Sequence, residues 1–198
     1  MQQLFDALSQ LTRQDPTPEH FSEFMGQVNA EKNDRGAAIL LACNAEIALR
    51  YAIRRQLTTT EDAEAILFRF GGPLRSFEAK IRVGYAMGLY REQTKNNLDC
   101  IRSVRNAFAH SVIPIRFDTL QVKAVCDLMT MPEIMPPRAV DPPTGLPQPI
   151  PGSTTTRQRF QRICEAVSHN IFLLGVHIAG APIEPKEALS TRAITPLA

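Results

Sequence analysis

The sequence lacks tryptophan altogether, has few aromatic residues and carries almost no net charge. The formal charge is +2 over 198 residues, so composition alone shows no electrostatic signature of a nucleic-acid binder. Hydrophobic residues make up 44% and charged residues 21%, which are ordinary fractions for a globular chain. A chain of this composition can bury a core without metals or disulfides, and its length fits one domain with appendages.

The cysteines are few and scattered, and no C-x-x-C pair occurs. All four fall inside predicted helices, at Cys43, Cys100, Cys126 and Cys164. This spacing is typical of neither a disulfide framework nor a zinc site, so we predict reduced, apolar core residues with no metal or other cofactor. Reduced cysteines in turn favour a cytoplasmic location.

No targeting or membrane-spanning segment is predicted. Residues 1–6 lack the basic start and the apolar run of a signal peptide. The most apolar stretch, residues 37–48, is shorter than the roughly 20 residues that span a bilayer, and it contains Asn44 and Glu46. We therefore expect no association with a membrane.

The chain also lacks the alternating pattern of strands, and helical spacing recurs instead. Predicted helices cover residues 3–12, 19–28, 34–56, 61–70, 77–89, 91–111, 119–129 and 156–178. The fold class is therefore all-α, a helical bundle with a proline-rich insertion and a C-terminal helix that packs back on the bundle. The alternative is that this last helix docks on a second subunit.

Local patterns set several of these helix ends. Residues 58–61 have the form of a capping box, and residues 71–73, Gly-Gly-Pro, predict a break. Ser76 is the predicted N-cap of the helix that follows. Asp118, with Gln121 three positions later, is the predicted cap of the helix that reaches residue 129.

The helix over residues 34–56 has the broadest apolar surface. Leu40, Cys43, Ile47 and Tyr51 fall on one face, and a neighbouring line widens it, formed by Leu41, Ala45, Ala48 and Ala52. A stripe this broad predicts a central helix that is packed on more than one side.

Composition divides the chain into parts. Residues 1–131 are predicted to form the helical bundle domain, and residues 132–152, which hold more than half of the prolines, a proline-rich irregular connection. Residues 153–179 contain the C-terminal helix, and residues 180–198 form a flexible tail. One hypothesis makes the chain an adaptor whose 132–152 segment recruits another protein.

The most informative chemistry lies in the predicted helix over residues 98–112. Its apolar stripe contains Arg105, and an arginine among apolar neighbours needs a carboxylate, a phosphate or carbonyl groups. The apolar members recur at steps of three and four and are Leu98, Ile101, Phe108 and Val112. Beside them runs a polar line that contains Asp99, Ser103, Asn106 and His110.

Two interpretations of this helix stay open. In the functional one, His110 moves a proton, Arg105 stabilises charge on a phosphate, and Asn106 orients either of them, so that RNA is cleaved without metal. In the structural one, His110 complements the dipole of the helix end and Arg105 pairs with a buried acid such as Glu46. The residues alone favour the structural interpretation, because a charged residue in an unusual environment occurs in structural ion-pair networks as well as in active sites.

Two other groups of arginines are candidate phosphate contacts. Residues 157, 159 and 162 begin the last helix, and residues 50, 54 and 55 end the helix over 34–56. A solvated helix face is the favoured interpretation of both groups, because few aromatic residues interleave to stack bases.

A set of motifs resembles the mannitol operon repressor family. The set comprises Phe70-Gly71-Gly72-Pro73-Leu74, Ser76-Phe77, Lys80-Ile81, Tyr85-Ala86-Met87-Gly88-Leu89, Asp99, Ile101-Arg102 and Arg105-Asn106-Ala107-Phe108-Ala109-His110. The resemblance covers residues 34–129, about half of the chain. The pattern of arginine, polar residue and histidine at a helix end also resembles the HEPN superfamily of helical bundles.

These resemblances imply two functions. The first is a mannitol-repressor-like transcriptional regulator, a helical interaction module without a helix-turn-helix that acts as a homodimer through a protein partner or an indirect association with DNA. The second is a HEPN-type, metal-independent endoribonuclease of a toxin or defence system, in which Arg105, Asn106 and His110 are catalytic and RNA is bound.

Overall fold

The described residues form an all-α bundle, as the sequence predicts. We analysed a computed structural model that describes Leu4 and residues 14–57, 61–69, 71–132 and 155–180, and these residues contain no strand. The helices are α2 (Pro18–Ala30), α3 (Asp34–Gln56), α4 (Glu61–Phe68), α5 (Phe77–Ala86), α6 (Glu92–His110), α7 (Leu120–Asp127) and α8 (Thr156–Gly180). The predicted helix over 3–12 lies outside the described residues except for Leu4. The connection over 132–152 and the tail over 180–198 lie outside them except for their first residues.

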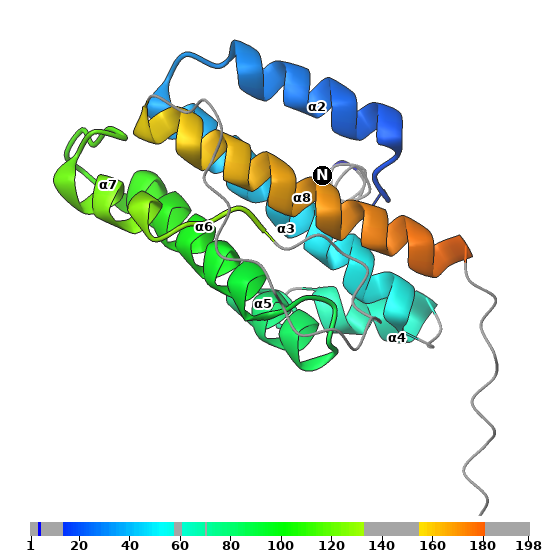
Figure 1. The fold of residues 1–198 in the computed structure, drawn as a ribbon. Helices are drawn as coiled ribbons and strands as arrows, with labels where there is room; N and C mark the ends of the chain where they lie inside the picture. Colours follow the sequence, from blue (N-terminus) through cyan, green and yellow to red (C-terminus); the bar gives the residue numbers. More distant parts are fainter. Residues whose placement is uncertain (1–3, 5–13, 58–60, 70, 133–154, 181–198) are drawn as a thin grey trace, which may run out of the picture.

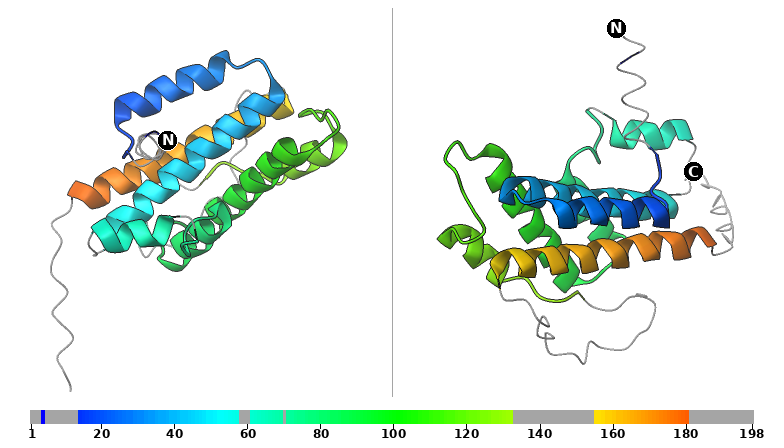
Figure 2. Two further views of the ribbon diagram at one scale, coloured as in Figure 1. Left: turned by 180° about the vertical axis from the view of Figure 1, so that it is seen from behind. Right: turned by 90° about the horizontal axis from the view of Figure 1, so that it is seen from above.

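The helix α3 is the centre of the bundle. It packs against α8, α6, α5 and α2, which confirms the predicted central helix (Figure 1). The helix α8 lies beside α3 along its length and runs in the same direction, whereas α6 lies on another side of α3 (Figures 1 and 2). The C-terminal helix therefore packs back on its own bundle, as predicted.

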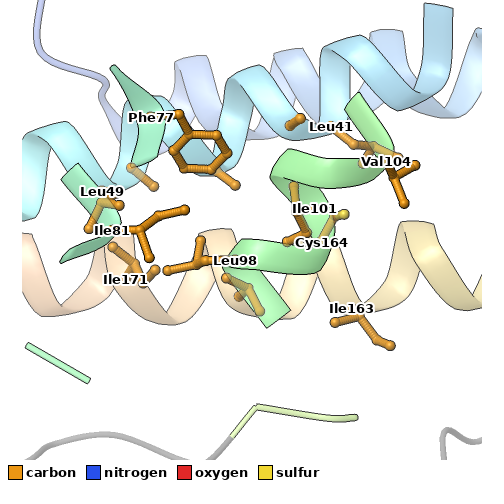
Figure 3. Packing of buried hydrophobic residues seen from close by; sticks show 14 of the residues in the cluster. Leu41, Leu49, Phe77, Ile81, Leu98, Ile101, Val104, Ile163, Cys164 and Ile171 are labelled. Carbon is orange, nitrogen blue, oxygen red and sulfur yellow. The ribbon is translucent and has the colours of Figure 1, made fainter. Parts of the chain in front are cut away.

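Buried side chains of α2, α3, α5, α6, α7 and α8 contribute to the core. In Figure 3, Leu41 and Leu49 of α3 and Ile81 of α5 face Leu98 and Ile101 of α6, with residues of α8 behind them. All of these are at most 1% exposed. At the α7 end, three aromatic rings form a chain, in which ring centroids lie 5.0 and 5.3 Å apart, from Phe108 through Phe117 to Phe160.

The buried face of α3 is rotated from the predicted one. The line through Leu41, Ala45, Ala48 and Ala52 is at most 1% exposed, but Cys43 is exposed and Ile47 is 44% exposed. The small alanines are buried because α8 approaches α3 closely on that side. A Cβ atom on Gly175 of α8 would lie only 2.5 Å from the ring of Tyr51.

The helix ends agree with the predictions in part. Ser76 caps α5, with its hydroxyl accepting from the N–H of Ala79 at 3.0 Å. The helix stops at Ala86, before the predicted residue 89, because Gly88 adopts φ +70° and the N–H of Leu89 bonds back to the carbonyl of Gly84. The helix α6 spans Glu92–His110, close to the predicted 91–111.

The predicted cap of α7 is wrong. The helix begins after Thr119, and no side chain caps it by a hydrogen bond. Asp118 is exposed and lies 4.0 Å from the guanidinium of Arg116, while the hydroxyl of Thr119 accepts from the N–H of Arg116 in the preceding turn. Val112 is likewise 97% exposed beyond the end of α6, and so does not belong to the buried stripe.

The prediction that the most apolar segment is too short to span a membrane is not confirmed. The helix α3 continues to Gln56, and its 23 residues are long and apolar enough by composition to cross a bilayer. Most of its apolar window is buried inside the bundle, which is how the core helix of a globular protein appears. The absence of a membrane association stays a prediction.

Candidate functional site

Arg105 lies on the side of α6 that faces α3, and its partner is the one predicted. Its Nη2 atom lies 3.6 Å from Oε2 of Glu46, with the two side chains 28% and 26% exposed. The guanidinium is therefore half-buried beside a carboxylate and does not point freely into solvent. The ion pair joins α6 to α3.

Lys80 of α5 holds the same carboxylate. Its Nζ atom lies 2.5 Å from Oε1 of Glu46 and also donates to the carbonyl of Arg75 at 2.9 Å. The lysine side chain is only 7% exposed, so its charge needs this partner. Glu46 thus ties together α3, α5 and α6, and Arg105 completes the group.

A second group of charges continues along α5 and α6. Arg102 lies 3.6 Å from Oε2 of Glu78 and 3.9 Å from Oδ1 of Asp99. Glu78 also pairs with Arg82, and Asp99 with Lys95 at 3.1 Å. We call the surface formed by both groups the ion-pair face, which comprises Glu46, Glu78, Lys80, Arg82, Lys95, Asp99, Arg102 and Arg105.

Asn106 and His110, unlike Arg105, have no ion-pair or hydrogen-bond partner for their side chains among the described residues. Asn106 is half-buried, and His110 is exposed in the last turn of α6. Ser103 of the same polar line donates to the carbonyl of Asp99 at 2.8 Å. The structure therefore shows the three predicted site residues on one helix, with no bond between them.

Sequence reasoning missed the role of Lys80. A lysine beside Phe77 and Ile81, on the face of α5 that is buried, is a cation at a core position, and that position alone requires an acidic partner. Lys80 appears among the motifs of the family resemblance, but the pairing with Glu46 depends on contact between two helices that the sequence does not specify.

The arginines at the start of α8 are tertiary tethers, so the predicted solvated face is wrong for two of them. Arg157 donates to the carbonyls of Glu31 and Lys32 and pairs with Asp34 at 3.0 Å. These contacts fix the start of α8 beside the start of α3. Arg162 is exposed, as expected.

Arg159 connects α8 to α7. It donates from Nε to the carbonyl of Cys126 at 3.0 Å and from Nη2 to the carbonyls of Met129 at 2.5 Å and Asp127 at 3.4 Å. The last carbonyls of a helix have no partner within the helix. Arg159 therefore caps the C-terminal end of α7 from another helix.

The arginines at the end of α3 are also engaged. Arg54 pairs with Asp15 and Glu64, and Arg55 pairs with Asp15 at 3.0 Å. Arg50 lies over the ring of Phe68, with its Cζ atom 5.5 Å from the centroid. A solvated face does not describe these residues, which link α3 to the segment before α2 and to α4.

The cysteines are all free, as predicted, but they differ in exposure. Cys126 and Cys164 are fully buried and Cys43 is exposed. Desolvation raises the pKa of the Cys126 thiol to about 12 and the pKa of the Cys164 thiol well above its ordinary value. The pKa of Cys43 is raised by partial desolvation and by the carboxylate of Glu46, while Arg105 lowers it, so this thiol belongs to the edge of the ion-pair face.

Within the part of the chain that the structure describes, no three His, Cys, Asp or Glu side chains are grouped so that they could hold a metal ion. The candidate site is the ion-pair face, because it brings the predicted Arg105 together with further charged hydrogen-bond donors.

Comparisons with known proteins add a similarity in fold. No protein-family model matches the chain, and no curated protein matches it. Among solved structures, the X-ray structure of the MtlR–HPr complex from Escherichia coli is similar, with 17% sequence identity and a TM-score of 0.48. The match covers 80% of this chain and 98% of that one. At this identity and TM-score, the similarity carries no assignment of function.

Proposed function

We propose that this chain is a regulatory protein that acts as a helical interaction module, like the mannitol operon repressor family that its sequence resembles. The observation that carries the proposal is the pairing of Arg105 with Glu46, whose carboxylate is itself held by the buried amine of Lys80. The pair joins α6 to α3, so the position of Arg105 is explained by a structural ion pair, which is what the regulatory interpretation expects of this residue.

The position of His110 supports the same proposal. A catalytic imidazole is commonly oriented by a hydrogen bond to a second group. In the described residues His110 has no such partner and stands exposed in the last turn of α6. An imidazolium at this place complements the helix dipole without any further role.

The proposed regulation is tested by deleting the gene in its own organism and measuring transcripts. We expect a limited set of transcripts to change, the mannitol operon first among those measured, and to return to normal when wild-type protein or His110→Ala is supplied. Unchanged transcripts across the genome would contradict the proposal.

The competing ribonuclease function makes the opposite prediction for His110. The purified wild type and His110→Ala are each incubated with single-stranded RNA without added metal. The same two proteins are also expressed in a bacterial host. We expect no cleavage by wild type and equal growth of the two strains. Cleavage by wild type that His110→Ala abolishes, or toxicity that it relieves, would establish the ribonuclease instead.

The homodimer and the protein partner are part of the proposal. Sedimentation equilibrium of the purified chain measures the first directly. A dimer of micromolar affinity would be fully formed at about 100 times its Kd. If the chain is still a monomer at that concentration, the proposed homodimer is excluded, and only the interaction with a different protein remains.

A further inference from the structure

The ion-pair face holds more cations than carboxylates. Each of its three carboxylates is shared by two cations: Glu46 by Lys80 and Arg105, Glu78 by Arg82 and Arg102, and Asp99 by Lys95 and Arg102. Because Arg102 belongs to two of these pairs, five cations share three carboxylates, and two positive charges remain in excess. The face is therefore positive, although the whole chain is close to neutral.

Two arginines of this face keep donors to spare. The ion pairs of Arg105 and Arg102 span 3.6 to 3.9 Å, longer than a normal hydrogen bond. A guanidinium has five N–H donors, and these side chains are still 27% and 28% exposed. Both arginines can therefore accept a further planar anion without leaving their present partners.

The two arginines stand a single helical turn apart on α6, which makes them neighbours on one side of that helix. The amide of Asn106 follows Arg105 and also lacks a partner among the described side chains. Figure 2 shows α3, which carries Glu46, and α6 side by side in the view from behind. The surface therefore combines positive charge with an amide.

This combination fits a peptide better than a nucleic acid. A nucleic acid carries a charge on every nucleotide, whereas this face has only two positive charges in excess of its carboxylates. Single-stranded nucleic acids also need aromatic side chains on which bases stack. Among the described residues, Tyr85 is the aromatic side chain with substantial exposure, and the amine of Lys95 lies 6.0 Å from its ring centroid. A carboxylate of a peptide, in contrast, matches the fork of one guanidinium.

We propose that the ion-pair face binds an acidic segment of a partner protein. Carboxylates of the segment bind Arg102 and Arg105. The inference rests on the proposed function in one respect, which is that the chain acts through a protein partner. It adds where that partner binds and what its segment contains.

The test uses the full chain and a fluorescein-labelled peptide of twelve residues in which glutamate and leucine alternate. Fluorescence anisotropy gives Kd for the wild type, Arg102→Gln, Arg105→Gln and Arg116→Gln. We expect each of the first two substitutions to weaken binding about tenfold, because each removes a charged hydrogen-bond donor. Arg116 is highly exposed outside the face, so Arg116→Gln is the matched control and should leave Kd unchanged.

Further measurements separate a specific site from a loss of fold or a general charge effect. A peptide of alternating glutamine and leucine should bind at least tenfold more weakly than the acidic peptide. Thermal melts should show each variant folded at the temperature of the assay. If Arg105→Gln does not fold, Arg105→Lys takes its place, and we expect a smaller loss because the charge remains while the fork is absent.

Three results would overturn the proposal. The first is no binding of the acidic peptide at millimolar concentration, and the second is binding that Arg116→Gln weakens as much as Arg102→Gln does. The third is tighter binding of a single-stranded RNA with the same number of charges through the same two arginines. Transcript changes on gene deletion are independent of these results, so this inference and the proposed function can fail separately.

Discussion

Two arginines at the start of α8 and two in the second half of α6 have different partners in the fold. Arg157 and Arg159 donate to backbone carbonyls, in the connection between α2 and α3 and at the end of α7 respectively. Arg102 and Arg105 face carboxylates that other cations already hold. The difference indicates that the first pair holds the fold together, whereas the second pair is available to a ligand.

The largest effect is expected where an arginine binds several carbonyls. Arg159→Gln removes a charged donor that three carbonyls at and just beyond the end of α7 share, so we expect the free energy of unfolding to fall by about 2–3 kcal/mol. Thermal or urea unfolding measures this loss. Arg162→Gln, an exposed position on the same helix, is the control and should change stability by less than about 0.5 kcal/mol. An equal loss in both variants would mean that Arg159 is no tether.

The next effect concerns the carboxylate at the centre of the ion-pair face. Glu46→Gln leaves the amine of Lys80, which is 7% exposed, without an opposite charge, so we expect a loss of about 2 kcal/mol. The double variant Glu46→Gln with Lys80→Met should be more stable than Glu46→Gln alone, because no buried charge remains. A double variant less stable than the single one would contradict the buried-charge explanation.

Arg105→Gln should cost much less. Its ion pair is long and its side chain is more than a quarter exposed, so we expect a loss of about 0.5 kcal/mol in the same unfolding experiment. The measurement sharpens the comparison of the two helices directly. A loss as large as that of Arg159→Gln would place Arg105 among the tethers and leave the ion-pair face without a spare arginine.

The smallest effect is on the chemistry of Cys43. Removing the positive charge of Arg105 should raise the pKa of this thiol further, so less thiolate is present near neutral pH and the thiol reacts more slowly with a disulfide reagent. Glu46→Gln should act in the opposite direction. Mass spectrometry of the modified protein identifies the residue, and the buried Cys164 serves as the slow internal control. Equal rates in the wild type and both variants would mean that Cys43 does not sense these charges.

Much of the fold follows from the sequence because it depends on local patterns. The bounds of α3 agree with the prediction, and Ser76 caps α5 as expected, since spacing and capping act within one helix. The side of α3 that is buried was not predictable in the same way. Cys43 and Ile47 have the apolar spacing of a core face, but the close approach of α8 selects the alanine line instead.

The candidate site was predictable only where a residue type demands a partner. Arg105 lies in an apolar stripe and therefore needs an acidic partner, and Glu46, which lies in an apolar helix, was the predicted one. The structure confirms this pair. Lys80 completes the group through a contact between α5 and α3 that leaves no pattern in either helix alone. The roles of Arg157 and Arg159 were missed for the same reason, because the carbonyls that they bind belong to every residue type.

The parallel pairing of α3 with α8 also has a consequence for folding. Their contacts join residues separated by more than a hundred positions, as between Asp34 and Arg157. Loops of that size close slowly compared with a helical hairpin, because closure must precede any gain from contact. During synthesis, we expect the side of α3 that α8 covers to stay accessible to chaperones and other chains until the last helix has been made.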